Sequence, residues 1–208
     1  MQPIQVAPSA PARLVVLASG TGSLLESLLA AAVGDYPARV VAVGTDRDCR
    51  AVEVAESAGL PVFTVRLADY PDRAAWDFAL AEATEAHAPD LVVSAGFMKI
   101  LGSEFLTRFL GRTVNTHPAL LPAFPGAHAV PDALAYGVKV TGCTVHLVDA
   151  GTDTGPVLAQ EPVAVLDDDD EDTLHERIKT VERKLLVDVL AALATGGVTW
   201  TGRKATIG

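Results

Sequence analysis

The stretch RLVVLASGTGS, residues 13–23, decides the fold of this chain. Its first part, Arg13–Ala18, is a short apolar run of the kind that forms a buried strand, and the glycine-rich SGTGS follows at once. The next segment, Leu24–Val33, has the composition of a helix. A strand that passes through a glycine-rich turn into a helix is typical of the first unit of an α/β fold.

The same alternation continues outward through the first half of the chain. The predicted strands are Val40–Gly44, Val62–Val65 and Leu91–Val93, and helices are predicted near Cys49–Ala58 and over Pro71–Ala86. Repeated strand–helix units predict a mostly parallel sheet with right-handed crossovers.

The second half of the chain has a different pattern. Thr113–Thr116 is a short predicted strand that leads into a proline-rich loop, HPALLPAFPGAH, residues 117–128. Two β-rich segments, Thr141–Val148 and Val157–Val165, are close enough in sequence to pair with each other. We therefore expect antiparallel strands in the C-terminal half of the sheet.

A long amphipathic helix is predicted near the end of the chain. Apolar residues recur there at spacings of four and three, namely Leu174, Ile178, Val181, Leu185, Val189 and Leu193. No internal repeat or long linker divides the sequence, so we expect one domain over residues 13–208. Residues 1–12 contain three prolines and no charged side chain, and we expect a disordered lead-in there.

Composition narrows the class of function. The 208 residues carry 16 basic and 26 acidic side chains, a net charge of −10, which argues against a nucleic-acid partner. No apolar stretch reaches the ~18 residues of a membrane helix, and a signal-peptide pattern is missing. The two cysteines, Cys49 and Cys143, suggest reduced thiols. We expect a cytoplasmic protein with no membrane partner.

The glycine-rich loop, Ser19–Ser23, is a candidate phosphate site. It lies between a strand and a helix, where backbone N–H groups and the helix dipole converge on an anion. The dinucleotide pattern G-x-G-x-x-G is incomplete, because its third glycine position holds Leu25. Asp46, at the end of the second strand, lies where a nicotinamide enzyme holds ribose. Two alternatives therefore remain for this loop: the dinucleotide site of a nicotinamide enzyme, and a tight turn that binds no ligand.

A polar group of residues in the second half is a candidate catalytic site. Asn115 and His117 share one face of a predicted strand and can donate together to one developing oxyanion. Thr144 and His146 share a face of a later strand, and Asp153 follows in a glycine-rich loop. A carboxylate beside an imidazole favours its charged form and fixes its orientation. This set is typical of acyl transfer by electrostatic stabilisation.

Two other interpretations of these histidines remain. His117 and His146 could be structural, one capping a loop and the other hydrogen-bonded in the core. Alternatively, His117, His128, His146 and Asp153 could hold a metal, although no H-E-x-x-H or paired helical spacing supports one.

Read together, these motifs resemble the folate-dependent glycinamide ribonucleotide formyltransferase family, from about Arg13 to Trp200. The quoted matches are SGTGS (19–23), APDLVVSAGFMKIL (88–101), NTHPALLP (115–122), TGCTVHLVDAGTDTGP (141–156) and the T-V-E of the last helix (180–182). Each motif alone is weak, and their order and spacing together are specific. The resemblance implies an α/β, Rossmann-like formyltransferase fold in a single domain, with a mostly parallel sheet.

The resemblance also implies roles for particular residues. It makes Asn115, His117 and Asp153 catalytic, with Asp153 keeping His117 protonated, and it places Thr144 and His146 behind them. The ribonucleotide would be bound by Thr21, Gly22, Ser23, Leu24 and Glu182. The folate would be bound by Arg73, Met98, Lys99, Ile100, Leu101, Asn115, Ala150, Gly151 and Thr152. Leu121–Pro122 would be a cis peptide bond.

The implied reaction moves a formyl group from 10-formyltetrahydrofolate to the amine of glycinamide ribonucleotide, in purine synthesis and without a metal. The sequence departs from the family pattern at Leu24, usually Asn, at Lys99, usually Arg, and at Thr116, usually Ile. We expect the Lys99 change to matter little unless a bidentate contact is needed. The sequence does not decide between a monomer and a homodimer.

Four other functions compete with this one. A methionyl-tRNA formyltransferase would have an added tRNA-binding domain, and a formyltetrahydrofolate hydrolase would have an N-terminal regulatory domain. A nicotinamide oxidoreductase would bind its dinucleotide, and a phosphosugar-binding module would bind ribonucleotide without turnover.

Overall fold

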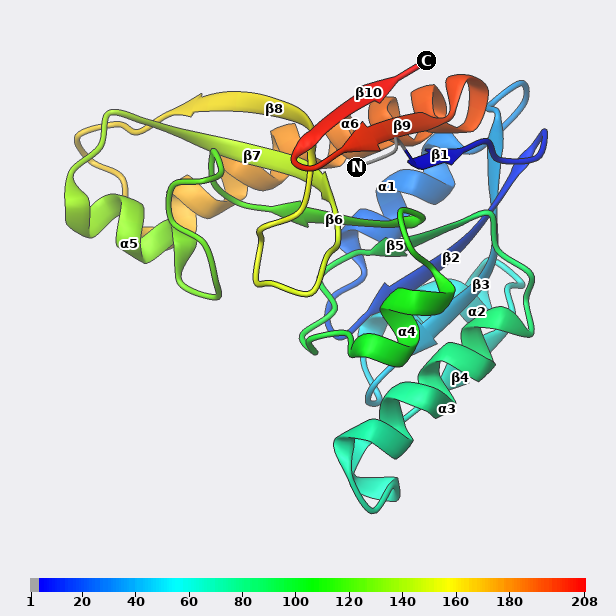
Figure 1. The fold of residues 1–208 in the computed structure, drawn as a ribbon. Helices are drawn as coiled ribbons and strands as arrows, with labels where there is room; N and C mark the ends of the chain where they lie inside the picture. The colour runs from blue at the N-terminus through cyan, green and yellow to red at the C-terminus, as the bar shows by residue number, and fades with distance from the viewer. Residues whose placement is uncertain (1–3) are drawn as a thin grey trace.

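The computed structural model describes residues 4–208, in which ten strands form one continuous sheet (Figure 1). Their order across the sheet is β1-β9-β10-β8-β7-β6-β5-β2-β3-β4. In chain order the strands are β1 (Ile4–Val6), β2 (Ala12–Ala18), β3 (Ala38–Thr45), β4 (Val62–Thr64), β5 (Leu91–Ser94), β6 (Thr113–His117), β7 (Val140–Leu147), β8 (Val157–Ala164), β9 (Val198–Thr201) and β10 (Lys204–Ile207).

Helices cover both faces of this sheet. Apolar side chains of α1, α2 and α6 pack on one face, and those of α3 and α4 pack on the other. The α-helices are α1 (Ser23–Ala31), α2 (Arg50–Ser57), α3 (Arg73–Glu85), α4 (Ser103–Arg108), α5 (Ala129–Tyr136) and α6 (Glu171–Gly196), and a 3₁₀ turn, η1, spans Leu67–Asp69. In the part of the chain that the structure describes, no helix is long and apolar enough to cross a membrane.

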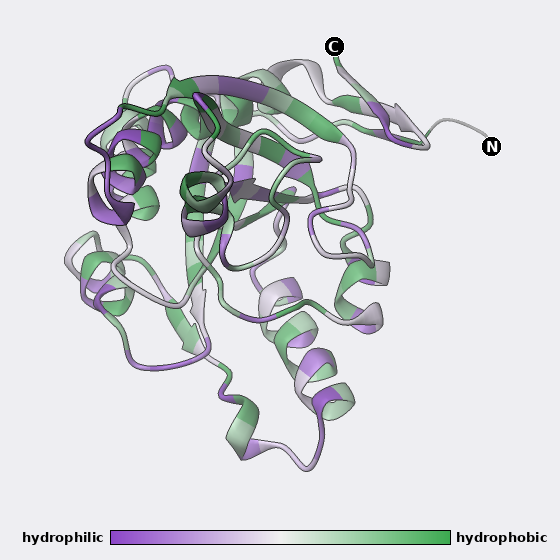
Figure 2. Ribbon diagram, turned by 90° about the vertical axis from the view of Figure 1, so that its left-hand side faces the viewer, coloured by the Kyte–Doolittle hydropathy of each residue, from purple (hydrophilic) through white to green (hydrophobic). Residues whose placement is uncertain are grey.

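The sequence of β2 explains the two-sided burial. Leu14 and Val16 point to the face of α1 and α6, whereas Val15 and Leu17 point to the face of α3 and α4. All four side chains are at most 1% exposed. A strand that is apolar on both faces belongs in the middle of a parallel sheet covered by helices. The hydropathy colouring agrees, with green along the central strands and mixed colours along the outer helices (Figure 2).

The predicted change of direction between the two halves is confirmed. Strand β2 pairs parallel with β3 and β5, β3 with β4, and β5 with β6. Strand β7 pairs antiparallel with β6 and with β8. Because β6 has a parallel neighbour on one side and an antiparallel one on the other, the two halves of the sheet meet along it.

The N-terminal segment corrects a prediction. We expected residues 1–12 to be a disordered lead-in, but β1 pairs antiparallel with β9, with Ile4 opposite Trp200. Ser9 also donates from its hydroxyl to Asp90 at 2.6 Å. The first three residues lie outside the described part of the chain. A strand of three residues is too short to show a periodic pattern, and its partner β9 lies far away in the sequence. The composition of residues 1–12 was therefore the only signal, and it suggested disorder.

Helix α6 is longer than the periodic pattern predicted. Asp170 caps its start, accepting from the Thr173 amide, while the Thr173 hydroxyl reaches back to form a capping box. The buried side of the helix includes Leu174, Ile178 and also one carboxylate, Glu182. The helix therefore covers the β6–β8 region and brings a charged group beneath it.

Candidate active site

Strand β6 places Asn115 and His117 on one face of the sheet, as the period of a strand predicts. Each lies opposite a polar residue of β7, Asn115 beside His146 and His117 beside Thr144. His117 is only 4% exposed. The antiparallel pairing of β6 with β7 therefore assembles four polar side chains from two segments that are distant in the sequence.

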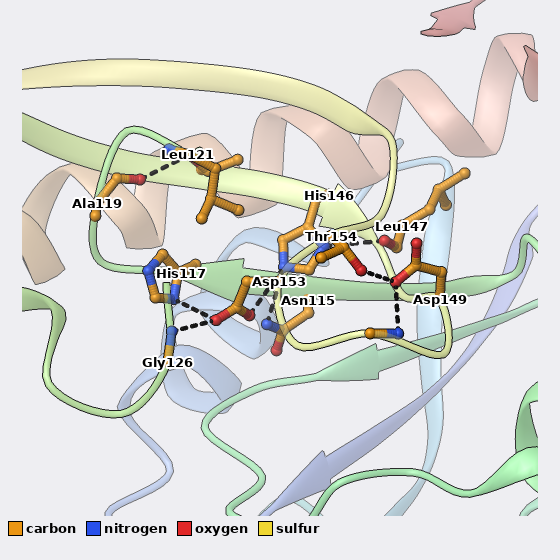
Figure 3. A network of polar contacts seen from close by, with 12 residues as sticks. Asn115, His117, Ala119, Leu121, Gly126, His146, Leu147, Asp149, Asp153 and Thr154 are labelled. Atoms are coloured by element: carbon orange, nitrogen blue, oxygen red, sulfur yellow. Dashed lines mark hydrogen bonds and ion pairs between the residues drawn. The ribbon is translucent and has the colours of Figure 1, made fainter. Parts of the chain in front are cut away.

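Asp153 lies at the centre of this group (Figure 3). Its Oδ2 is 3.4 Å from His117 Nδ1, and its Oδ1 is 3.6 Å from His146 Nε2. The Gly126 amide donates to Oδ2 at 2.8 Å. The hydrogen bond from His146 lowers the pKa of Asp153 to about 2, helped by the Gly126 amide and the charge of His117 against the opposing effect of burial. The carboxylate is therefore charged at any physiological pH.

The ring of His117 is held on both sides. Its Nε2 is 2.7 Å from the carbonyl oxygen of Phe124, which can only accept, so Nε2 carries a proton and donates. Its Nδ1 faces the Asp153 carboxylate. Both ring nitrogens thus face oxygen acceptors, an arrangement that the doubly protonated imidazolium satisfies.

His146 and Asn115 share a proton-dependent contact. His146 Nδ1 donates to the Leu147 carbonyl oxygen at 2.9 Å, and His146 Nε2 lies 3.2 Å from Asn115 Nδ2. A neutral ring accepts a hydrogen bond from the Asn115 amide. A protonated ring donates from Nε2, and both the Asp153 carboxylate and the Asn115 amide oxygen can accept that hydrogen bond. His146 Nε2 therefore connects Asn115 with Asp153.

Thr144 holds the proline-rich loop rather than the catalytic candidates. Its hydroxyl donates to the Ala119 carbonyl oxygen at 2.7 Å and accepts from the Leu121 amide at 3.1 Å. Gln160 of β8 donates to that hydroxyl at 3.0 Å and to the Leu121 carbonyl oxygen at 2.8 Å. The expected cis bond between Leu121 and Pro122 is present. Sequence analysis missed Gln160, because nothing in β8 marks it.

A cleft of about 160 Å³ opens beside this network. Most of the residues predicted to bind folate line it, with others that the sequence did not single out. The lining residues are Ser94, Phe97, Lys99, Ile100, Leu101, Asn115, His146, Val148, Asp149, Gly151, Thr152 and Asp153. The lining combines apolar side chains, from Phe97, Ile100, Leu101 and Val148, with polar groups that can orient a small molecule.

Of the predicted catalytic and folate-binding residues, four lie off the cleft lining: His117, Met98, Ala150 and Arg73. His117 lies behind Asp153, and the Met98 amide donates to the Ser19 hydroxyl at 2.8 Å. Arg73 donates to the carbonyl oxygen of Ile100, and its guanidinium lies 5.4 Å from the Trp76 ring centroid. Arg73 thus supports the segment that forms one wall.

The glycine-rich loop leads directly into α1. Gly22 has a φ of +74°, and an added Cβ would lie 3.0 Å from the Ala51 Cα of α2. No side chain caps the described start of α1, so its first amides are available to an anion. The side chain of Leu24 packs against the core, which leaves only its backbone for a ligand. Thr21 and Ser23 flank the turn.

Glu182 lies on the opposite face of β6 from Asn115 and His117. It is 7% exposed, and burial raises the pKa of its carboxyl group, although a hydrogen bond from the Thr116 hydroxyl opposes that shift. Helix α6, which carries Glu182, contacts α1 on this face. The structure therefore brings Glu182 to the side of the sheet where the glycine-rich loop starts its helix.

The geometry gives one alternative, a nicotinamide enzyme, little support. Asp46, the candidate ribose acid of a nicotinamide enzyme, is engaged by Lys99 at 2.8 Å and by Arg47 at 2.9 Å. Within residues 4–208, no group of three or more histidine, cysteine or acidic side chains is arranged to hold a metal.

Three comparisons with known proteins agree with this geometry. Residues 12–190 match the model of a family described as formyl transferase. Phosphoribosylglycinamide formyltransferase of Mycobacterium tuberculosis strain H37Rv is 76% identical over 207 residues, which cover 100% of this chain and 96% of that protein. The crystal structure of glycinamide ribonucleotide transformylase 1 from Symbiobacterium toebii is 42% identical, with a TM-score of 0.91 over 94% of this chain and 93% of that one.

Proposed function

The chain belongs to the formyl transferase family, and on that basis we propose that it transfers the formyl group of 10-formyltetrahydrofolate to the amine of glycinamide ribonucleotide. The products are formylglycinamide ribonucleotide and tetrahydrofolate, and the step belongs to de novo purine synthesis. The observation that carries the proposal is the 76% identity, over nearly the full length of both chains, to a protein named for this activity.

The two substrates are assigned to two separate sites. The ribonucleotide phosphate binds the backbone amides at Gly22, Ser23 and Leu24 with help from Thr21, and Glu182 accepts from the ribose hydroxyls. The folate ring occupies the cleft, whose walls include the apolar side chains of Ile100 and Leu101. The other folate contacts come from Lys99, Asn115, Gly151 and Thr152, with Arg73, Met98 and Ala150 at the rim.

The transfer itself rests on Asn115, His117 and Asp153. The uncharged glycinamide amine attacks the formyl carbon, and negative charge grows on the formyl oxygen. The Asn115 amide meets this charge from the cleft wall, and His117 adds a second donor when its Nε2–H leaves the Phe124 carbonyl. The Asp153 carboxylate gives His117 Nδ1 a charged acceptor at 3.4 Å. A proton then moves from the attacking nitrogen to the departing folate nitrogen through water ordered by Asp153.

His146 orients Asn115 for this step. With its Nδ1–H held by the Leu147 carbonyl, His146 presents Nε2 to the Asn115 amide and to the Asp153 carboxylate, and so fixes the position of both groups beside the cleft. None of these steps requires a metal or a covalent intermediate on the enzyme. A cytoplasmic location is proposed as well, which two free thiols support.

A two-substrate assay tests this function. Purified protein is incubated with glycinamide ribonucleotide and 10-formyltetrahydrofolate, and formylated ribonucleotide and tetrahydrofolate are measured together. Equal amounts of both products are expected. Formate release without the ribonucleotide would indicate a hydrolase, and ribonucleotide binding without any product would indicate a binding module.

A further inference from the structure

A buried ion cluster lies between the two proposed ligand sites. Asp46 follows the last residue of β3 and is 5% exposed. Its Oδ2 is 2.8 Å from Lys99 Nζ and 2.9 Å from Arg47 Nη2. Lys99 lines the cleft, whereas half of the Arg47 side chain is exposed to solvent. The carboxylate therefore joins a cleft residue to the end of a central strand.

Ser19 connects the same carboxylate to the glycine-rich loop. Its amide donates to the Gly96 carbonyl oxygen at 3.2 Å, and its hydroxyl oxygen accepts from the Met98 amide at 2.8 Å. The hydroxyl proton is thus free to donate to Asp46. A chain of contacts runs from the Met98 amide through Ser19 and Asp46 to Lys99.

The Met98–Leu101 segment, which these contacts hold, buries few of its side chains. The side chains of Met98 and Ile100 are 66% and 67% exposed, and only the flanking Phe97 and Leu101 are buried. Exposed loop residues gain little from burial, so hydrogen bonds must fix their backbone. Burial opposes ionisation of Asp46, but hydrogen bonds from Arg47, Lys99 and Ser19 hold the pKa of its carboxyl group well below the usual range.

From these contacts we infer that Asp46 is a positioning residue for the folate cleft: it holds Lys99 and the Met98–Leu101 segment in register with the glycine-rich loop. The inference rests on the proposed function, because it assigns the cleft to folate. It agrees with the expectation that Lys in place of Arg at position 99 matters little, because either side chain can pair with the buried carboxylate. It adds that loss of the positive charge at position 99 should matter, because that charge is the partner of a buried carboxylate.

The Asp46→Asn variant tests this role. The carboxylate charge disappears while the side-chain size stays, so Lys99 loses its ion pair. We expect the folate KM, and the dissociation constant of tetrahydrofolate measured by calorimetry, to rise about tenfold, as for loss of one charge-assisted hydrogen bond. The kcat at saturating folate and the ribonucleotide KM should stay within about twofold of wild type.

Asp48→Asn is the matched control. It removes the same charge two positions away, at a side chain that is 89% exposed and paired with Arg66 outside the cleft. Both KM values should stay unchanged. Lys99→Arg should keep folate affinity, and Lys99→Gln should lose it. The Asp46→Asn and Lys99→Gln losses should combine less than additively, because both break one contact.

Two outcomes would overturn the inference. One is wild-type tetrahydrofolate affinity in a folded Asp46→Asn protein. The other is an equal rise in both KM values with a lowered melting temperature, which would mark a purely structural role. Absence of turnover in the wild type would instead overturn the proposed function, and tetrahydrofolate binding would still test Asp46.

Discussion

The glycine-rich loop and the polar network around Asp153 prepare the molecule for its ligands in opposite ways. The loop, in the parallel half of the sheet, offers backbone amides, and its side chains are small or turned inward. The network, where the antiparallel half begins, offers side-chain groups of Asn115, His117, His146 and Asp153 that contact one another. The two regions therefore differ in what a substitution can damage.

Backbone N–H donors remain when a side chain is replaced, but a larger side chain in the loop can displace them. Gly22 shows this, because its positive φ and its approach to Ala51 leave no room for a Cβ. In the network each of these side chains contacts another polar group, so replacing one carboxylate oxygen of Asp153 by nitrogen changes the charge beside its neighbours. We expect large losses of kcat from isosteric changes in the network, and losses of ribonucleotide affinity from bulk in the loop.

The largest effect should come from Asp153→Asn. The substitution keeps the size but removes the charge that holds His117 and His146, so kcat should fall roughly 10²-fold or more, the scale of lost electrostatic or acid–base assistance. Asn115→Ala and His117→Ala should fall in a similar range, and pairs of these changes should be less than additive. Steady-state kinetics with both substrates measures this. A near-normal kcat in Asp153→Asn would refute the mechanism.

The acid stability of the same variant gives a second test of the network. The pKa of Asp153 is about 2 in the folded protein and near 3.8 for an ordinary aspartate, so its stabilising effect is full above pH ~4 and disappears as the pH falls toward 2. The difference in melting temperature between wild type and Asp153→Asn should therefore shrink over that window. A constant difference across it would contradict a salt-bridged Asp153.

Gly22→Ala should have the next largest effect, on the loop. A left-handed φ costs a residue with a Cβ about 1–2 kcal/mol, and the Ala51 contact adds to this. We expect the ribonucleotide KM to rise about tenfold on this estimate, with a much smaller change for folate. Gly20→Ala is the control, since an added Cβ there meets nothing within 4 Å. Equal losses for both substrates would indicate misfolding.

Glu182→Gln should separate affinity from stability. Because burial raises the pKa of Glu182, the folded state holds its proton more tightly, and the charged group destabilises the fold above about pH 4.5. The variant should melt at a higher temperature at pH 7 and lose this advantage in acid. Its ribonucleotide KM should rise several-fold if Glu182 binds ribose. An unchanged KM would remove Glu182 from the proposed site.

Leu24→Asn should have the smallest effect. The Leu24 side chain packs on the core beside α1, while its amide lies at the start of the helix. Ribonucleotide KM should be unchanged or slightly lower, with a small loss of thermal stability from the buried apolar area. Calorimetry and a melting curve measure both. A severe loss of affinity would show that the loop depends on this side chain, and would weaken the contrast between the two regions.

Local patterns allowed much of the fold and of the site to be predicted. The apolar run of β2, the alternation that joins Asn115 to His117, and the periodic face of α6 are all visible over a few residues. Features that depend on distant pairing were not, such as β1, which pairs with β9. The β9–β10 hairpin and the short helices α4 and α5 were missed as well.

The residues of the candidate site show the same limit of prediction from local sequence patterns. Asp46 looked like a ribose acid because strand order suggested it, and only the folded chain shows Lys99 beside it. Gln160 and Phe97 carry no local signal, and they join the site through pairing of β8 with β7 and through the end of β5. Sequence spacing cannot report contacts between segments whose approach is set by the whole sheet.

The pairing of β1 with β9 has a consequence for how the chain is made. During synthesis on a ribosome, β1 emerges long before its partner Trp200. The parallel core from β2 to β5 is complete before β9 is made, so it must persist while Ile4–Val6 has no neighbour. The nascent chain therefore carries an unpaired strand edge until β9 emerges, and such edges are open to wrong partners during that time.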